Sequence, residues 1–139
     1  MKLRTILAPF AVLLAGLAQA QPKDAVLLDM QQAFRQGNKG RLAQLLPAAR
    51  GHALEPWAAY WELRARLDTA TPQEVQDFLT RYAGTYQEDR LRNDWLLLLG
   101  QRRDWAIFAQ EYPRYRMNDD REVRCYALLV QYLRDGPSS

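Results

Sequence analysis

Apolar residues recur at three- and four-residue intervals along most of the chain, which is the spacing of amphipathic helices. No segment alternates apolar and polar residues for long enough to favour a strand, so the pattern predicts an all-α protein. Pro47 lies near the end of the second predicted helix and makes that boundary the least well defined. The predicted helices cover residues 24–36, 40–49, 55–67, 72–84, 87–99, 105–112 and 120–134.

Capping residues precede several of these helices. Thr71 and Glu74 have the spacing of a capping box, in which each side chain binds the other residue's backbone N–H. Asp104 is predicted to cap the short helix that follows it. Asp119 and Glu122 have the capping-box spacing again and predict the start of the last helix.

Four apolar positions recur in register in three of the predicted helices, at intervals of 33 and 30 residues. Repetition of helix pairs at this period predicts an α-solenoid of antiparallel helical hairpins, superhelical and with tetratricopeptide-like packing. The alternative is chance similarity among amphipathic helices. The repeating positions are Leu42, Leu45, Leu46 and Ala49, then Val75, Phe78, Leu79 and Tyr82, then Trp105, Phe108, Ala109 and Tyr112.

The helix predicted over 55–67 carries Trp57, Tyr60 and Trp61 within an apolar arc that covers more than half of its circumference. Such a wide arc predicts burial on more than one side, so the rings are interpreted as core rather than as a ligand platform. Arg64 falls inside the arc, and its guanidinium is expected to reach a carboxylate or solvent. The predicted solvent-facing strip contains Glu55, Ala59, Glu62 and Arg66.

The first twenty residues have the three parts of a cleavable secretory signal peptide. Lys2 and Arg4 give a basic start, residues 6–17 are apolar, and Ala18-Gln19-Ala20 is a small-x-small cleavage site. The alternative is a membrane anchor, but the apolar run is too short to span ~30 Å of hydrocarbon. Gln21 follows the cleavage site, so a lipidated cysteine is excluded there. We therefore predict a signal peptide over 1–20 and a periplasmic helical-repeat domain over 21–139, without stable membrane insertion.

The charge of the predicted mature chain is close to balanced. The whole chain has a net charge of +3, and removal of Lys2 and Arg4 leaves seventeen basic and sixteen acidic side chains. Acidic residues and arginines are mixed along the helices, as on an ordinary solvated surface. The absence of a basic stripe argues against nucleic acid as a partner.

The only cysteine and the only histidine do not form a recognisable reactive site. Cys125 lies in an apolar run and is expected to be a small buried hydrophobe; the alternative is a disulfide with a partner outside the chain. His52 is expected to be a solvated loop residue, since it has no second histidine or cysteine at metal-ligand spacing.

The acidic residues show no clear catalytic arrangement. The adjacent pairs Glu88-Asp89 and Asp119-Asp120 lie at predicted helix starts, where a carboxylate favours the helix dipole. No glycine-rich phosphate loop and no G-x-S-x-G motif occur. The sequence therefore assigns no catalytic, cofactor-binding or metal-binding residue, and no cofactor or metal is expected.

The central part of the chain resembles a known family. Four segments carry the resemblance: Y-W-x-L-R-x-R-L from Tyr60, T-P-x-E-V-x-x-F-L-x-R-Y from Thr71, R-L-R-x-D-W-L from Arg90, and R-x-D-W-x-x-F-x-x-E-Y-P from Arg102. Together they are similar to the N-terminal superhelical region of soluble lytic murein transglycosylases. The resemblance extends over about residues 25–133 and is most specific in the middle.

The resemblance implies a two-part enzyme, in which a ring or horseshoe of helices precedes a lysozyme-like catalytic domain. Family members cleave the β-1,4 bond between N-acetylmuramic acid and N-acetylglucosamine, a lyase reaction that leaves a 1,6-anhydro product. A glutamate in a Glu-Ser motif acts as acid and base, without metal or cofactor. Because this chain has no Glu-Ser dipeptide, no catalytic residue is transferred to it. The chain is expected to be a C-terminally truncated scaffold part of such an enzyme.

Two hypotheses about partners follow. As a scaffold, the chain would serve an enzyme whose catalytic domain binds peptidoglycan glycan strands. As a stand-alone helical-repeat interaction module, it would bind periplasmic proteins. A cut repeat array would also leave one side of the last helix exposed and favour self-association. That side is predicted to carry Tyr126, Leu129, Val130 and Leu133.

Overall fold

The computed structural model describes residues 2 and 22–137, so the predicted signal peptide lies outside the described residues apart from Lys2. Every secondary-structure element in the described part of the chain is a helix and none is a strand, which confirms the all-α prediction. Its elements are α1 (Pro22–Arg35), α2 (Lys39–Ala49), α3 (Glu55–Ala65), α4 (Pro72–Arg81), α5 (Tyr86–Gln101), α6 (Trp105–Glu111), the 3₁₀ helix η1 (Tyr112–Arg114) and α7 (Arg121–Asp135).

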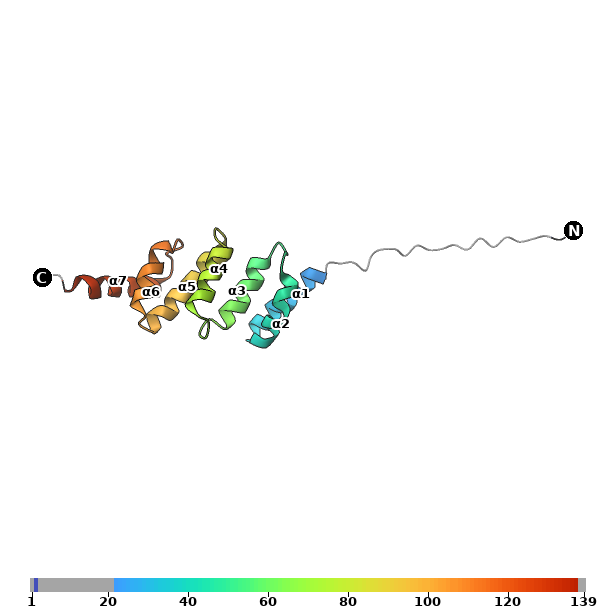
Figure 1. Cartoon of the computed structure of the whole chain (residues 1–139), viewed down its shortest axis with the longest axis horizontal. Helices are drawn as coiled ribbons and strands as arrows, with labels where there is room; N and C mark the ends of the chain where they lie inside the picture. The colour runs from blue at the N-terminus through green and yellow to red at the C-terminus, as the bar shows by residue number, and fades with distance from the viewer. Residues whose placement is uncertain (1, 3–21, 138–139) are drawn as a thin grey trace.

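Alternate helices form a row: α1 contacts α3, α3 contacts α5, and α5 contacts α7. The remaining helices pack on members of this row, with α2 on α1 and α3, α4 on α5, and α6 on α5 and α7. Figure 1 shows the helices following one another along the long axis, from α1 at one end to α7 at the other. Contacts between helices therefore remain local in the sequence.

The apolar core follows this row of helices as two adjoining clusters. The first cluster lies between α1, α2 and α3 and contains the fully buried Met30, Leu42 and Ala58. The second extends from α3 to α7 and contains the fully buried Phe108 and Val123. Leu46 and Trp61 pack against both clusters, so no break in the core separates the two ends of the chain.

Helix capping agrees with the sequence at two positions and differs at one. Thr71 and Glu74 form the predicted capping box of α4, and the Asp104 carboxylate accepts the Ile107 N–H of α6. The predicted Asp119 cap of α7 is wrong, because Asp120 accepts the N–H groups of Glu122 and Val123. The Asp119 carboxylate instead accepts the Tyr115 hydroxyl, at 3.0 Å.

Candidate functional site

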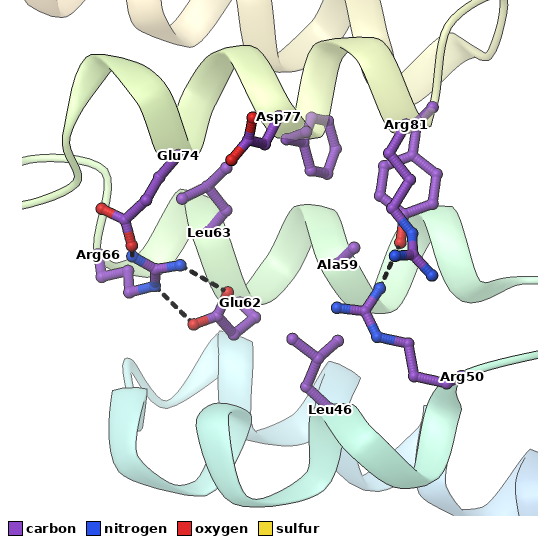
Figure 2. Close-up of a pocket in the computed structure, with 11 residues that line it drawn as sticks. Leu46, Arg50, Ala59, Glu62, Leu63, Arg66, Glu74, Asp77 and Arg81 are labelled. Carbon is purple, nitrogen blue, oxygen red and sulfur yellow. Dashed lines mark hydrogen bonds and ion pairs between the residues drawn. The ribbon is translucent and has the colours of Figure 1, made fainter.

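A groove with a volume of about 250 Å³ opens between α2 and α4, and α3 forms its floor. Figure 2 shows Leu46 and Arg50 on the α2 side, Glu74, Asp77 and Arg81 on the α4 side, and α3 between them. The middle of the groove is apolar and both of its ends carry charged side chains. Its lining residues are Leu46, Arg50, Ala59, Glu62, Leu63, Arg66, Glu74, Asp77, Phe78, Arg81 and Tyr82.

At one end of the groove two arginines converge on a single carboxylate. The Tyr82 hydroxyl donates to Oε2 of Glu55 at 2.6 Å and accepts Nη1–H of Arg50 at 2.8 Å. Nε of Arg81 lies 3.5 Å from the same Glu55 oxygen. The side chains of Arg50 and Arg81 are 41% and 56% exposed, so this end offers two solvated guanidinium groups to an anion.

At the other end one arginine is held between two carboxylates. Arg66 donates to Oε1 of Glu62 at 2.6 Å and to Oε1 of Glu74 at 2.7 Å. Dashed lines in Figure 2 mark the bonds between Arg66 and Glu62. The hydrogen bond with Glu62 is the main cause that raises the pKa of Arg66. Glu74 also closes the α4 capping box, so this ion pair ties the start of α4 to α3.

Two carboxyl groups at the ends of the groove, those of Glu55 and Glu74, are poor proton donors. Burial acts to raise the pKa of Glu55, but the hydrogen bonds from Tyr82 and the Gly51 N–H, together with the nearby arginines, hold it below its usual value. The Thr71 N–H and Arg66 lower the pKa of Glu74. A general acid needs a raised pKa near neutral pH, so these groups suit ionic binding rather than proton transfer.

The predicted solvent-facing strip of α3 is wrong for two of its residues. Ala59 and Glu62 are buried, and they form the groove floor under α4. Ala59 is small enough for a close approach, and Glu62 is neutralised by Arg66 one turn later. The four-residue spacing of Glu62 and Arg66 was the available sequence signal for this ion pair.

The aromatic residues singled out in the sequence divide into two groups. Tyr60 is buried, as predicted, and its hydroxyl donates to Oδ2 of Asp94 at 2.6 Å. Burial, followed by this hydrogen bond, raises the pKa of Tyr60 above its usual range. Arg64 lies 3.4 Å from the same Asp94 oxygen, which confirms the expected carboxylate partner.

Trp57 and Trp61 are only half-buried at the edge of the core. Their rings stack with centroids 5.8 Å apart, and the Trp57 ring lies 5.7 Å from that of the exposed Tyr86. With Leu27, Leu28, Gln31 and Leu54 they line a second, apolar groove of about 350 Å³ between α1 and α3. Each ring therefore packs against the core on one side, as predicted, and lines this open groove on the other.

The prediction that His52 is a solvated loop residue is wrong. Its side chain is only 13% exposed, and its Nε2 lies 2.5 Å from Oδ1 of Asp24. Because the Leu54 N–H donates to Nδ1, the neutral ring carries its proton on Nε2 and donates it to Asp24. His52 thus links the α2–α3 loop to α1.

The Glu88-Asp89 pair does more than favour the dipole of α5. Both residues are buried beside Arg92, which donates to Glu88 at 2.5 Å and to Asp89 at 3.1 Å. Asp89 also accepts the backbone N–H groups of Arg116 and Met117, so it holds the loop before α7. Burial acts to raise the pKa of Glu88, but Arg92 and other donors leave it lowered.

Cys125 is a free thiol on the surface of α7, so its predicted burial is wrong. The residues of α7 that turn toward the core are Val123 and, less completely, Tyr126, Ala127 and Val130. Cys125 lies on the other side of the helix. The alternative, a disulfide with a partner outside the chain, stays a hypothesis.

Within residues 22–137, no group of three or more histidine, cysteine, aspartate and glutamate side chains is placed to hold a metal ion. None of the described helices combines the length and the apolar character needed to cross a membrane. Comparisons of the chain with protein-family models, with curated proteins and with solved structures found no match.

Proposed function

We propose that the protein is a non-catalytic α-solenoid scaffold that serves a peptidoglycan lytic transglycosylase in the periplasm. The observation that carries the proposal is the row of helices whose contacts are local in the sequence, with an open groove on the side of α2 and α4. Helical-repeat proteins have this type of packing and use such surfaces for binding. The four segments that resemble the transglycosylase superhelical region lie in α3 to α6 and η1.

The groove gives the scaffold a specific binding chemistry. Its apolar centre suits an extended chain with aliphatic groups, and the guanidinium groups of Arg50 and Arg81 suit a carboxylate at one end of that chain. The peptides of peptidoglycan carry free carboxylates next to small aliphatic side chains. We therefore assign peptidoglycan, through its peptides, as the ligand of the groove.

The carboxyl groups of Glu55 and Glu74, at the two ends of the groove, support a scaffold rather than an active site. Lytic cleavage needs a glutamic acid that is protonated when the glycosidic oxygen leaves. Glu55 and Glu74 have lowered pKa values, and Glu62 is paired with Arg66 at 2.6 Å. The proposal therefore places cleavage in a separate catalytic domain or protein.

The second candidate is a stand-alone module that binds a periplasmic protein through the same groove. The exposure of Arg50 and Arg81 at one end favours it, because a protein's C-terminal carboxylate would meet the same two groups. The two candidates share the groove and differ in the ligand.

Cosedimentation with purified peptidoglycan sacculi tests the proposal. The purified chain should sediment with the sacculi and should release no anhydro-muropeptides on its own. A groove variant, Arg50→Gln with Arg81→Gln, should lose most of the binding. The control variant, Arg35→Gln with Arg103→Gln, removes the same charge from exposed positions outside the groove and should bind like the parent.

Each outcome decides between the candidates. A chain that stays in the supernatant at low and high salt contradicts peptidoglycan binding. If it then binds peptides with a free C-terminus, and the groove variant does not, the interaction module is correct. Release of anhydro-muropeptides by the chain alone would contradict the scaffold assignment.

A further inference from the structure

The outer side of α7 is apolar and no other described element covers it. The inner side packs on α5 and α6 through the fully buried Val123. Leu129 and Leu133 are exposed, as predicted, but Tyr126 and Val130 turn toward the core and are half-buried. The exposed apolar side chains of this helix are Leu128, Leu129, Tyr132 and Leu133.

Five exposed residues on this side are spaced four, three, four and three positions apart in the sequence. They are Arg121, Cys125, Leu128, Tyr132 and Asp135, which we call the α7 seam. Apolar residues at such intervals occur where two helices pack lengthwise, and the three central positions of the seam, Cys125, Leu128 and Tyr132, are apolar. The centre of the seam is apolar, whereas its two ends carry opposite charges.

We propose that the α7 seam pairs with the same seam of a second copy of the chain, with the two helices antiparallel. The two-fold axis then passes near Leu128, which packs against the partner's Leu128. Cys125 lies against the partner's Tyr132, and Arg121 faces the partner's Asp135. The seam is therefore complementary to itself, as a two-fold contact requires.

Charge selects the antiparallel orientation. In a parallel pair the two Arg121 side chains would face each other, as would the two Asp135 side chains, and both contacts would be repulsive. The guanidinium of Arg121 makes no hydrogen bond or ion pair with any described residue. Asp135 accepts Nε–H of Arg134 at 2.8 Å but keeps a half-exposed carboxylate that can take a second guanidinium.

The length of the seam implies a weak dimer. From Arg121 to Asp135 it extends over about 21 Å at the helical rise per residue. A single helix pair of this length buries less than the standard area of a stable interface. The dimer should therefore form in a concentration-dependent way.

Sedimentation velocity of the purified chain over a concentration series tests the dimer. The chain should change from monomer to dimer, and Leu128→Glu should weaken dimerisation at least tenfold, because two carboxylates would meet at the axis. The control is Leu28→Glu, since Leu28 and Leu128 are both 67% exposed and Leu28 lies on α1. It should leave dimerisation unchanged.

A charge reversal tests the orientation. Arg121→Asp and Asp135→Arg should each weaken the dimer about tenfold, because each change makes two symmetric contacts repulsive. The double variant should dimerise like the parent. If the double variant is as weak as the single variants, the antiparallel pairing is wrong.

Disulfide capture gives an independent test of the register. In the antiparallel pair the two Cys125 residues are about 9 Å apart along the axis, which is too far for a disulfide. In a Cys125→Ala background, Leu128→Cys should form an intermolecular disulfide readily under mild oxidation, whereas the parent should form little. Rapid Cys125 cross-linking, a monomer at every concentration, or loss of the dimer only in Leu28→Glu would each overturn the proposal.

Discussion

α5 and α7 differ in an unexpected way, since α5 buries charged side chains and α7 exposes apolar ones. Arg92 of α5 is 5% exposed, whereas Leu128 of α7 is 67% exposed. Helices α3, α4, α6 and α7 all pack on α5, so most of its circumference is covered. α7 contacts α5 and α6, and its outer side faces solvent. Position in the row of helices therefore decides burial more than residue type does.

The largest effect on the stability of the fold should come from removing the buried guanidinium of Arg92 in α5. Arg92→Ala leaves Glu88, Asp89 and Glu111 buried without their shared partner, so the unfolding free energy should fall by about 3–5 kcal/mol. Urea unfolding measured by circular dichroism checks this value. Arg124→Ala, at an exposed position on α7, is the control and should change stability by less than about 0.5 kcal/mol. A similar small change in Arg92→Ala would show that the buried network contributes little.

The second-largest effect on stability should come from the contact between Gly100 of α5 and Tyr126 of α7. A Cβ atom on Gly100 would lie 2.3 Å from Cδ2 of the Tyr126 ring, so α5 and α7 meet too closely there for any side chain. Gly100→Ala should destabilise the protein by about 1–3 kcal/mol, because the Tyr126 ring must move. Hydrogen exchange should show faster exchange in α7 than in α3. Gly40→Ala is the control, since its Cβ would meet only Asn38 Oδ1, at 3.9 Å.

The sequence was enough to predict where the helices lie, because spacing and capping are local properties. Thr71 and Glu74 cap α4 as predicted, for example. It was not enough to predict which side of each helix is covered. Glu62 was assigned to solvent and Cys125 to the core, and both assignments are wrong. Burial at these positions depends on which neighbouring helix crosses them, and a single amphipathic pattern does not contain that information.

The same limit applies to the candidate site. The apolar arc of α3 drew attention to Trp57 and Trp61, whereas the α2–α4 groove is built on the opposite, polar side of that helix. Arg50 and Arg81 are 31 residues apart in the sequence, Arg50 directly after α2 and Arg81 at the end of α4. Their convergence on Glu55 is a tertiary feature, so no local motif could have predicted it.

A smaller effect should appear as a pH dependence that originates in α5. The pKa of Glu88 is lowered in the folded protein, so the unfolded chain binds its proton more readily. The stabilisation is fully present above the unfolded pKa of about 4.3 and is lost as the pH falls through the lower folded value. Chemical unfolding between about pH 6 and pH 3 should show this loss, and Glu88→Gln should make the slope shallower. An unchanged slope in Glu88→Gln would contradict a contribution of this carboxylate to the pH dependence.

The smallest effect should come from the outer side of α7. Leu128→Gln, studied at concentrations low enough for a monomer, should change the unfolding free energy by less than about 0.5 kcal/mol, because the leucine is already in water. Leu96→Ala on α5 should cost about 2–5 kcal/mol, since Leu96 is fully buried. Thermal unfolding of the two variants under the same conditions measures the difference directly. If Leu128→Gln were as destabilising as Leu96→Ala, the outer side of α7 would be covered in the monomer, and the contrast between the two helices would not hold.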